Sequence, residues 1–311
     1  MTHHTSPLGV KPTYAPAGGG LQNRPVAGAW SIIAAALMFA CMGALIKIVS
    51  TSLSNEAIVF FRNLFSLGFT FPWLIGGRGI DQLKTRCFHL HLVRCMTGLG
   101  AMYCLFYAVA HLKLSEAVML SLTNPLFIPL IAFIWIGEMP LKRAWGAIVI
   151  GFAGIALILR PGPGIMDINS LVGLMAGVCI AFEMVTIRRM SSTEPAVRIV
   201  FYFVLLSTLI SAIPLLWAGR IPSPHEWLYL LLVGLSATVG QFFMAKGYSL
   251  APAAHVSPFS YGTVLFAALL GRIFWNEALD AAGWAGTALI CGGGVLTIHG
   301  AKPVDGPHSI A

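Results

Sequence analysis

The sequence predicts an all-α integral membrane protein with ten transmembrane helices, built as two inverted five-helix repeats with both termini in the cytoplasm. Three observations support this fold class: a charge-poor composition, ten apolar runs of spanning length, and a match between the two halves of the chain. Of the 311 residues, 57% are hydrophobic and only 10% are charged, and the mean hydropathy is +0.83. Soluble domains carry about 25% charged residues. Hydrocarbon must therefore contact most of this chain.

The basic balance of the chain, a formal net charge of +8, does not indicate nucleic-acid binding. The Lys and Arg residues occupy short gaps between apolar runs and form no basic face. The six cysteines show no CxxC or Cys/His ligand spacing. The sequence therefore predicts no nucleic-acid partner, no disulfide framework, no metal site and no cofactor.

The apolar runs are about 18–25 residues long, which suffices to cross a hydrocarbon core of about 30 Å. Short connectors with turn chemistry separate them. Residues 1–25 are polar and rich in Gly, Pro and Thr, so they predict a disordered cytoplasmic tail rather than a signal peptide. The runs cover residues 27–49, 56–75, 91–110, 115–136, 142–160, 168–188, 197–218, 226–246, 253–275 and 280–299.

The distribution of Lys and Arg predicts the orientation of the chain, because cytoplasmic connectors carry an excess of these residues. With the amino terminus inside, thirteen of them lie at the cytoplasmic side or its boundary and four at the outer side. Arg62 and Arg272 lie within helices. Both termini are therefore predicted to be cytoplasmic.

An internal match indicates a duplication. Residues 127–157 align with the chain 139 positions later, so that Glu138 meets Glu277 and Trp145 meets Trp284. Each segment thus combines a helix, an acidic turn and a helix rich in small residues. Because five crossings per repeat is an odd number, the two repeats cross the membrane in opposite senses. Inverted repeats place the substrate near the midplane between the halves.

These features resemble the EamA branch of the drug/metabolite transporter superfamily. The resemblance rests on the duplicated five-helix unit, the "FFR" of the second run, and the turns Gly137-Glu138 and Asn276-Glu277. It implies two EamA-like repeats, at residues 26–161 and 167–300, followed by a cytoplasmic tail at 301–311. It also implies transport. The family includes exporters of amino acids and siderophore-like metabolites as well as uptake systems for cofactors, so the resemblance leaves the substrate open.

Arg62 is the charge that most needs an explanation, because a guanidinium at the bilayer centre costs about 2.5–3.5 kcal/mol on insertion scales. The residue lies roughly 10 Å below the outer boundary. It either extends its charge toward the headgroups or faces the outer vestibule and attracts a carboxylate or phosphate of the substrate. Lys47 lies at a similar outer depth and adds to an anion-tolerant vestibule.

Glu183 is the most deeply placed acid in the chain, and acids inside membranes are functional by default. It is a candidate for binding a cationic group of the substrate or for coupling transport to protons. The alternative is a structural contact, either a hydrogen bond to a neighbouring helix or an ion pair with Arg188 or another base at the inner side.

Neutral polar and aromatic side chains complete the candidate site. The amides of Asn124 and Gln241 suit the orientation of a substrate, or they connect helices. Pro125 and Pro258 free the carbonyls of Ser121 and Ala254 near the middle of their helices. Tyr103, Tyr107 and Tyr261 form an aromatic wall or a packed aromatic stripe.

Catalytic motifs are absent: the sequence has no GxSxG, no HExxH and no P-loop. An intramembrane enzyme using Glu183 or His255 is therefore disfavoured, as is a receptor. We expect a non-enzymatic secondary transporter in the bacterial inner membrane, monomeric or homodimeric, driven by a gradient with protons as the coupling ion. Its substrate is expected to be an amino-acid-like, zwitterionic or cationic metabolite that is exported. The alternative is uptake of a cofactor or nucleoside-type metabolite such as S-adenosylmethionine or riboflavin.

Overall fold

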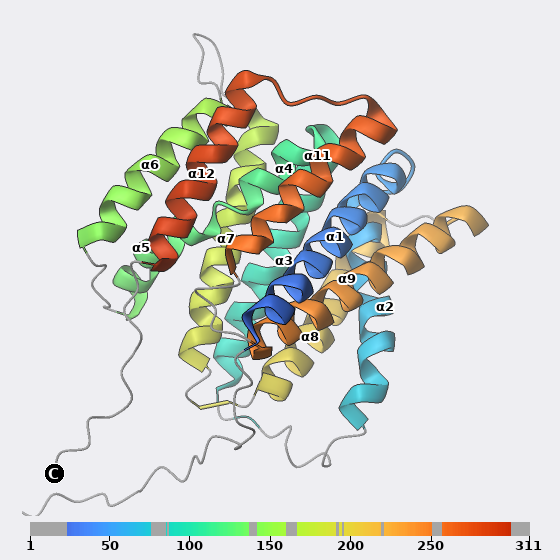
Figure 1. Ribbon diagram of the computed structural model, residues 1–311. Coiled ribbons are helices and arrows are strands. Elements are labelled where there is room, and N and C mark those ends of the chain that lie inside the picture. The colour runs from blue at the N-terminus through green and yellow to red at the C-terminus, as the bar shows by residue number, and fades with distance from the viewer. Residues whose placement is uncertain are drawn as a thin grey trace, which may run out of the picture.

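The described part of the chain is a bundle of helices without strands (Figure 1). The computed structural model describes residues 24–75, 85, 87–136, 142–159, 167–190, 193–194, 196–218, 221–250 and 257–299. Its elements are α1 (Pro25–Val49), α2 (Asn55–Ile75), α3 (Phe88–His111), α4 (Leu114–Ser121), α5 (Asn124–Ile136), α6 (Lys142–Leu159), α7 (Ile168–Met190), α8 (Ala196–Ala218), α9 (Pro224–Leu250), the 3₁₀ helix η2 (Ser257–Tyr261), α11 (Gly262–Trp275) and α12 (Ala281–His299).

Each of the ten predicted apolar runs contains helix, and most boundaries agree within a few residues. Among the described residues, six spans are long and apolar enough to cross a membrane. The crossing of the other four runs, and with it the count of ten, stays a prediction. The six spans are Val26–Val49, Phe88–His111, Leu114–Trp135, Ile168–Ile187, Arg198–Trp217 and Pro224–Gly247.

The fourth run is not one continuous helix, because it breaks between α4 and α5. The backbone leaves α4 at Ser121 and re-enters helix at Asn124, which puts Pro125 in the first turn of α5. A first-turn proline loses no hydrogen bond, because that N–H has no partner inside the helix. Pro129 lies further along α5, inside the helix. The prolines of this run therefore produce a full break rather than a kink alone.

The ninth run also begins irregularly. Its described part starts as the 3₁₀ helix η2, which contains Pro258, and becomes α-helical only at Gly262. Ala254, whose carbonyl Pro258 was predicted to free, and His255 lie outside the described residues. The same holds for the Glu138 turn and both tails.

Helices from the two halves pack against each other in a reciprocal pattern. The most extensive contacts join α1 with α9, α3 with α7, and α6 with α12. When the membrane-spanning helices are counted within each half, the first helix packs on the third helix of the other half, and this contact occurs twice. The fifth helix of one half packs on the fifth helix of the other. α2 likewise packs on α8, and α4 on α11. Every one of these contacts joins one half of the chain to the other.

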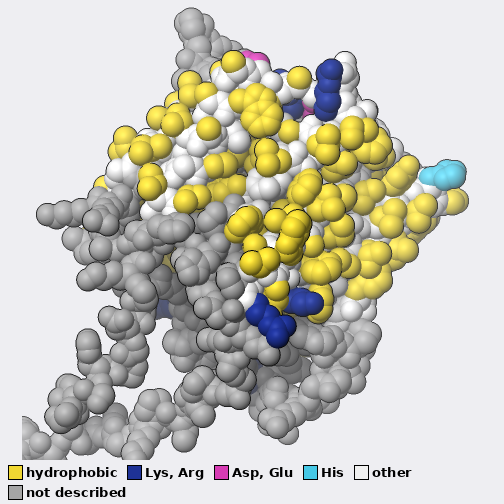
Figure 2. Space-filling view, in the orientation of Figure 1, with side chains coloured by type: hydrophobic (Ala, Val, Ile, Leu, Met, Phe, Trp, Pro, Cys, Tyr) yellow, Lys and Arg dark blue, Asp and Glu magenta, His cyan; other side chains and the backbone are white. Residues whose placement is uncertain are grey.

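The bundle surface is largely apolar, as expected for a protein in lipid. Figure 2 shows a face covered by hydrophobic side chains, with Lys and Arg side chains near its upper and lower margins. Large apolar residues stand free on the surface, including Ile134 at 82% and Leu216 at 83% exposure. Such exposure would be unfavourable in water, and it is normal where hydrocarbon is the solvent.

The helix termini lie at two opposite ends of the bundle. The Lys47 end is the end where α1 finishes and α2 begins; the α11–α12 connection lies there too, at the top of Figure 1. The Glu194 end is the opposite one, where α7 finishes and α8 begins.

Candidate functional site

A cluster of buried charges lies inside the bundle, where helices of both halves meet. We call Arg62, Asn63, Arg94 and Glu183 the arginine cluster. Arg62 and Asn63 belong to α2, Arg94 to α3 and Glu183 to α7. The guanidinium Nη2 of Arg94 lies 3.5 Å from Oε1 of Glu183. Both Arg62 and Arg94 interact electrostatically with the Glu183 carboxylate.

Three of the four residues of the cluster are buried, and the side chain of Glu183 is 14% exposed. Arg62 is 8% exposed, Asn63 1% and Arg94 7%. With two guanidinium groups and one carboxylate, the cluster carries a formal charge of +1. A lone charge in such surroundings is unfavourable unless an opposite charge and hydrogen bonds accompany it.

Several N–H donors of the cluster have no hydrogen-bond acceptor among the described residues. Nη1 of Arg62 donates to Oδ1 of Asn63 at 2.9 Å. No acceptor among the described residues bonds Nε of Arg62, Nδ2 of Asn63, or Nε and Nη1 of Arg94. Every unsatisfied atom of the cluster is therefore a donor nitrogen. An unmet buried donor costs about 1–3 kcal/mol, and more when it is charged.

Phe203 and Gly98 shape the surroundings of Arg94 and Glu183. The guanidinium carbon of Arg94 lies 4.1 Å from the centre of the Phe203 ring, a cation–π contact. A Cβ atom at Gly98 would lie 2.5 Å from Cε2 of Phe203 and 3.3 Å from the Glu183 carboxyl carbon. Only glycine therefore lets α3 approach both side chains this closely.

The structure places Arg62 inside the bundle rather than at the headgroups. Its hydrogen-bond partner is the adjacent Asn63 on the same helix, and the nearby opposite charge is that of Glu183 on α7. Glu183 pairs with Arg94 on α3, a base that was predicted to lie near the inner boundary. The side chain of Arg188, the predicted partner, lies outside the described part of the structure. Arg62 and Glu183, which the sequence indicated separately, therefore belong to one cluster.

Lys47 does not stand open to a vestibule, because it forms a second charged contact, here called the Lys47–Glu277 bridge. Nζ of Lys47 donates to Oε1 of Glu277 and to the Leu112 carbonyl, the latter at 2.6 Å. Oε2 of Glu277 accepts from the Leu114 amide at 2.9 Å. The bridge therefore ties α1 and the α3–α4 connection to the α11–α12 connection at the Lys47 end.

The local backbone explains why Glu277 reaches this position. Asn276 ends α11 with a left-handed conformation, at φ 54°. Asn tolerates this region better than other residues with a Cβ. A Cβ at Gly271 would come within 2.8 Å of Oε2 of Glu277, so glycine leaves room for the carboxylate. The turn thereby points the acid back at Lys47.

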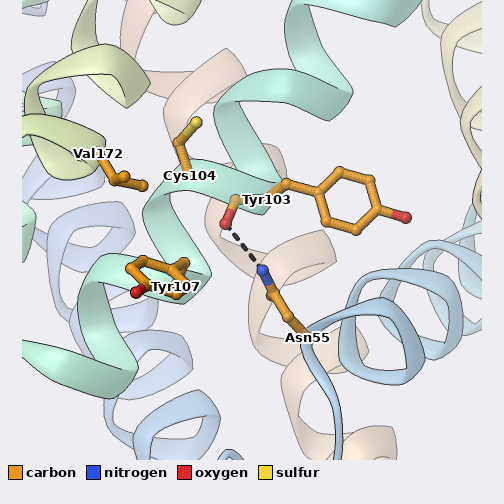
Figure 3. Close-up of a pocket in the computed structure, with 5 residues that line it drawn as sticks. All are labelled: Asn55, Tyr103, Cys104, Tyr107 and Val172. Carbon is orange, nitrogen blue, oxygen red and sulfur yellow. Dashed lines mark hydrogen bonds between the residues drawn. The ribbon is translucent and has the colours of Figure 1, made fainter. Parts of the chain in front are cut away.

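The predicted aromatic wall is only partly formed. Tyr103 and Tyr107 line a shallow hollow of about 250 Å³ together with Asn55, Cys104 and Val172. Figure 3 shows that their rings point in opposite directions, although four residues separate them on one helix. Asn55 donates to the Tyr103 carbonyl at 2.9 Å. Tyr261 does not line this hollow; its side chain is 7% exposed and packs in the apolar core.

The two predicted amides lie away from the arginine cluster. Asn124 is half-buried at the first position of α5, beside the break in the fourth run. Gln241 is exposed on α9. Its neighbour Gly240 faces α1, since a Cβ there would contact Phe39. The Gln241 amide thus points away from the helix interface, and the prediction that it orients a substrate has no support in this geometry.

A polar contact closes the Glu194 end. Glu194 accepts from Thr85 at 2.7 Å and from Nη1 of Arg198 at 2.5 Å. Burial acts to raise the pKa of Glu194, but these hydrogen bonds and the charge of Arg198 outweigh it and hold the pKa below its usual value. His91 lies nearby, 1% exposed, with its ring 4.5 Å from that of Tyr202.

Three residues in and around the cluster were not predicted from the sequence. Arg94 was assigned to the boundary because its run was predicted to begin at residue 91, whereas α3 begins at Phe88. The arginine is followed by an uninterrupted apolar run, and this pattern could have indicated that Arg94 lies within the helix. Asn63 and Phe203 carried no signal of their own, because only the packing of α2, α3 and α8 reveals their neighbours.

A charged site buried between the halves of an apolar helical bundle defines the class of protein: a multi-pass membrane protein that handles a polar solute. The chain belongs to the EamA-like transporter family, whose model matches twice, over residues 26–160 and 168–298. This identifies the fold class and the transporter class together.

Named relatives agree with this assignment. The chain is 31% identical to the pseudopaline exporter CntI of Pseudomonas aeruginosa over 261 residues, which is 83% of this chain and 91% of that protein. It is 27% identical to a riboflavin transporter of Brucella anthropi, over 78% of this chain and 87% of that one. It is 23% identical to an S-adenosylmethionine uptake transporter of Rickettsia prowazekii, over 82% and 87%. These relatives are transporters rather than enzymes, as the sequence predicted.

A solved crystal structure has the same fold. It superposes with a TM-score of 0.57 at 18% identity, over 87% of this chain and 96% of that chain.

Proposed function

We propose that the protein is a secondary transporter that exports a small amino-acid-like metabolite across the bacterial inner membrane by alternating access. The arginine cluster is the observation that carries this proposal. It lies on α2, α3 and α7, so both halves contribute to it. Ionisable groups inside a membrane bundle mark solute pathways, and sites between repeats suit rocking of one half against the other.

Export is the direction favoured by the relatives. The pseudopaline exporter is more similar to this chain than the riboflavin and S-adenosylmethionine transporters, and the chain covers more of its length. Uptake of a cofactor or nucleoside-type metabolite is the second candidate. The S-adenosylmethionine uptake transporter supports both the direction and the substrate class, and the riboflavin transporter supports the substrate class.

The inverted-repeat architecture is part of the proposal. Two arguments support it: one family model matches both halves, and the contacts between halves are reciprocal. A twofold relation between repeats makes the contact of the first helix with the third occur twice, as α1 with α9 and α7 with α3.

The Lys47–Glu277 bridge gives this model a closed side. Inside the proposed topology it lies at the outer face, where it joins the two repeats. Opening toward the outside then requires Lys47 and Glu277 to separate. The structure accordingly corresponds to a state closed on that side.

Glu183 is the proposed coupling group. Its counter-ions are Arg94 and Arg62, the groups that an entering carboxylate would occupy. An amine of the substrate pairs with the Glu183 carboxylate only while that carboxylate is deprotonated. Binding of the substrate and binding of a proton at Glu183 therefore exclude each other, as export driven by an inward proton gradient requires.

Replacing Glu183 by glutamine tests coupling directly. Glu183→Gln keeps the size and hydrogen bonding of the side chain but cannot exchange a proton. We expect normal insertion, loss of gradient-driven transport, and a transport rate that no longer depends on pH. The assay is transport into proteoliposomes with and without an imposed pH gradient. Glu116→Gln, which alters an exposed pair with Lys113, serves as the control. Wild-type transport and pH dependence in Glu183→Gln would end the coupling hypothesis.

Transport and its direction are tested in cells and vesicles. Untargeted metabolite profiling of a deletion strain, inside and outside the cell, should show accumulation inside if the protein exports. Loss of uptake with unchanged internal pools supports the uptake candidate instead. Proteoliposomes separate a carrier from an enzyme, because a carrier moves a compound without changing it.

Reporter fusions test the topology. A reporter after Lys302 and one near Glu138 should both be cytoplasmic, and one near Glu277 should be external. If both glutamate turns report the same side, the inverted arrangement is wrong.

A further inference from the structure

The charge and the free donors of the arginine cluster are asymmetric, and this asymmetry limits the substrate. Among the described residues, the cluster has two guanidinium groups against one carboxylate. Its unsatisfied polar atoms are the four nitrogens on Arg62, Asn63 and Arg94, and all of them donate. Neither fact depends on the direction of transport.

From this we propose that the arginine cluster binds a carboxylate of the substrate, and that the substrate is an amino-acid-like anion with more carboxylates than amines. This inference rests on the proposed function and narrows its substrate class. A net charge of −1 on the substrate brings the occupied site to neutrality. A zwitterion would leave the +1 uncompensated, and a cation would raise it.

Arg62 is the main anchor for the carboxylate. Arg94 is already held by Glu183 and by the ring of Phe203. Among the described residues, by contrast, the Arg62 guanidinium donates a hydrogen bond only to the neutral Oδ1 of Asn63. A guanidinium offers parallel donors that match the two oxygens of a carboxylate. Nδ2 of Asn63 adds a further donor beside Arg62.

Glu183 keeps a defined role in this arrangement. Its carboxylate balances one of the two guanidinium groups while the site is empty. When the substrate is bound, the same carboxylate is available for an amine of the substrate. The substrate therefore carries at least two carboxylates if it also carries one amine.

The test measures the charge of what binds, independently of transport. The purified full-length chain in detergent is dialysed to equilibrium against a bacterial metabolite extract, and the retained compounds are identified by mass spectrometry. We expect the retained compounds to be net anionic carboxylates. Arg62→Gln should lower their retention at least tenfold. Retention of mainly neutral or cationic compounds, or no retention, overturns the inference.

Arg272→Gln is the matched control. Nη1 of Arg272 also donates to an asparagine oxygen, that of Asn276 at 2.6 Å, but the residue is exposed at the end of α11. This variant should retain the same compounds as the wild type. If Arg62→Gln fails to fold, Arg62→Lys keeps the charge without the paired donors and should still weaken retention several-fold. Equal retention by wild type and a folded Arg62 variant overturns the inference.

The same proteins in proteoliposomes separate this inference from the proposed function. Compounds that bind in detergent but never enter the vesicles show that the site is right and the transport proposal wrong. Compounds that enter the vesicles but are neutral or cationic show that transport is right and the charge inference wrong.

Discussion

Among the described residues, two ion pairs connect the halves of this protein, and they differ in how completely their polar groups are satisfied. In the Lys47–Glu277 bridge one cation meets one anion, and each also bonds the backbone, at Leu112 and Leu114. In the arginine cluster two cations meet one anion, and four donor nitrogens have no acceptor among the described residues. A contact in which charges and hydrogen bonds are matched can hold the bundle closed without a ligand. A contact with surplus positive charge and unpaired donors can still bind an anionic ligand.

The energetic consequences follow from this difference. Surplus buried charge destabilises the empty protein and is compensated when an anion binds, so binding and stability are linked. The bridge needs no ligand, and its contribution is already complete in the empty state. Variants in the bridge and in the arginine cluster should therefore differ in how much they change stability and in how their stability responds to ligand.

The largest effect on stability is expected for Glu183→Gln. It leaves Arg62 and Arg94 buried without any counter-charge, and breaking a buried pair in this way destabilises by about 3–5 kcal/mol. The double variant Arg94→Gln/Glu183→Gln returns the cluster to its original charge and should recover most of this loss. Thermal unfolding in detergent, followed by intrinsic fluorescence, measures both. Equal unfolding temperatures for the single and double variants would show that charge surplus is not the cause.

An intermediate effect is expected for Glu277→Gln in the bridge. Lys47 keeps its bond to the Leu112 carbonyl, so the loss is that of one charged hydrogen-bond pair, about 1.5–3 kcal/mol. The Lys47 end should then open more often. Cys104, which lines the hollow beside Tyr103, should react several-fold faster with a thiol reagent, as measured by mass spectrometry.

The Lys113–Glu116 pair provides the control for this experiment. It lies at the same end, at 3.4 Å, but its side chains are 39% and 22% exposed, and exposed pairs contribute about 0–1 kcal/mol. Glu116→Gln should leave the labelling of Cys104 unchanged. If Glu277→Gln labels no faster than Glu116→Gln, the bridge does not close this end.

The sequence predicted the positions of the helices well, because apolar length is a local property. The prediction of α1, for example, covered residues 27–49 and the helix is Pro25–Val49. It failed where the backbone departs from regular helix, between Ser121 and Asn124. Pro125 was predicted to lie near the middle of one helix, but it lies in the first turn of a new helix, α5.

The candidate site was predicted in part for the same reason. Arg62 and Glu183 stood out because a charge within an apolar run is visible in one dimension. Their proximity was not visible, since α3 packs on both α2 and α7 and this arrangement brings the two residues together. Lys47 and Glu277 were each noticed separately, and 230 positions separate them in the chain. Contacts between helices of different halves require the three-dimensional packing.

The smallest effect is expected at the Glu194 end, which differs from both contacts above by lying outside the spanning segments. The folded-state pKa of Glu194 is lowered, so its contribution is present above the unfolded value of about 4.3 and is lost as the pH falls through the folded value. Glutamine can still accept from Thr85, so Glu194→Gln should cost about 0.5–1.5 kcal/mol near neutral pH, the net contribution of one hydrogen bond. The difference in unfolding temperature from the wild type should shrink below about pH 4.3. Thr85→Val removes one of the bonds that lower the pKa and should move this acid limb to higher pH. A wild-type advantage that persists at about pH 3, below the usual range of a glutamate pKa, would show that the Glu194 charge does not stabilise this end.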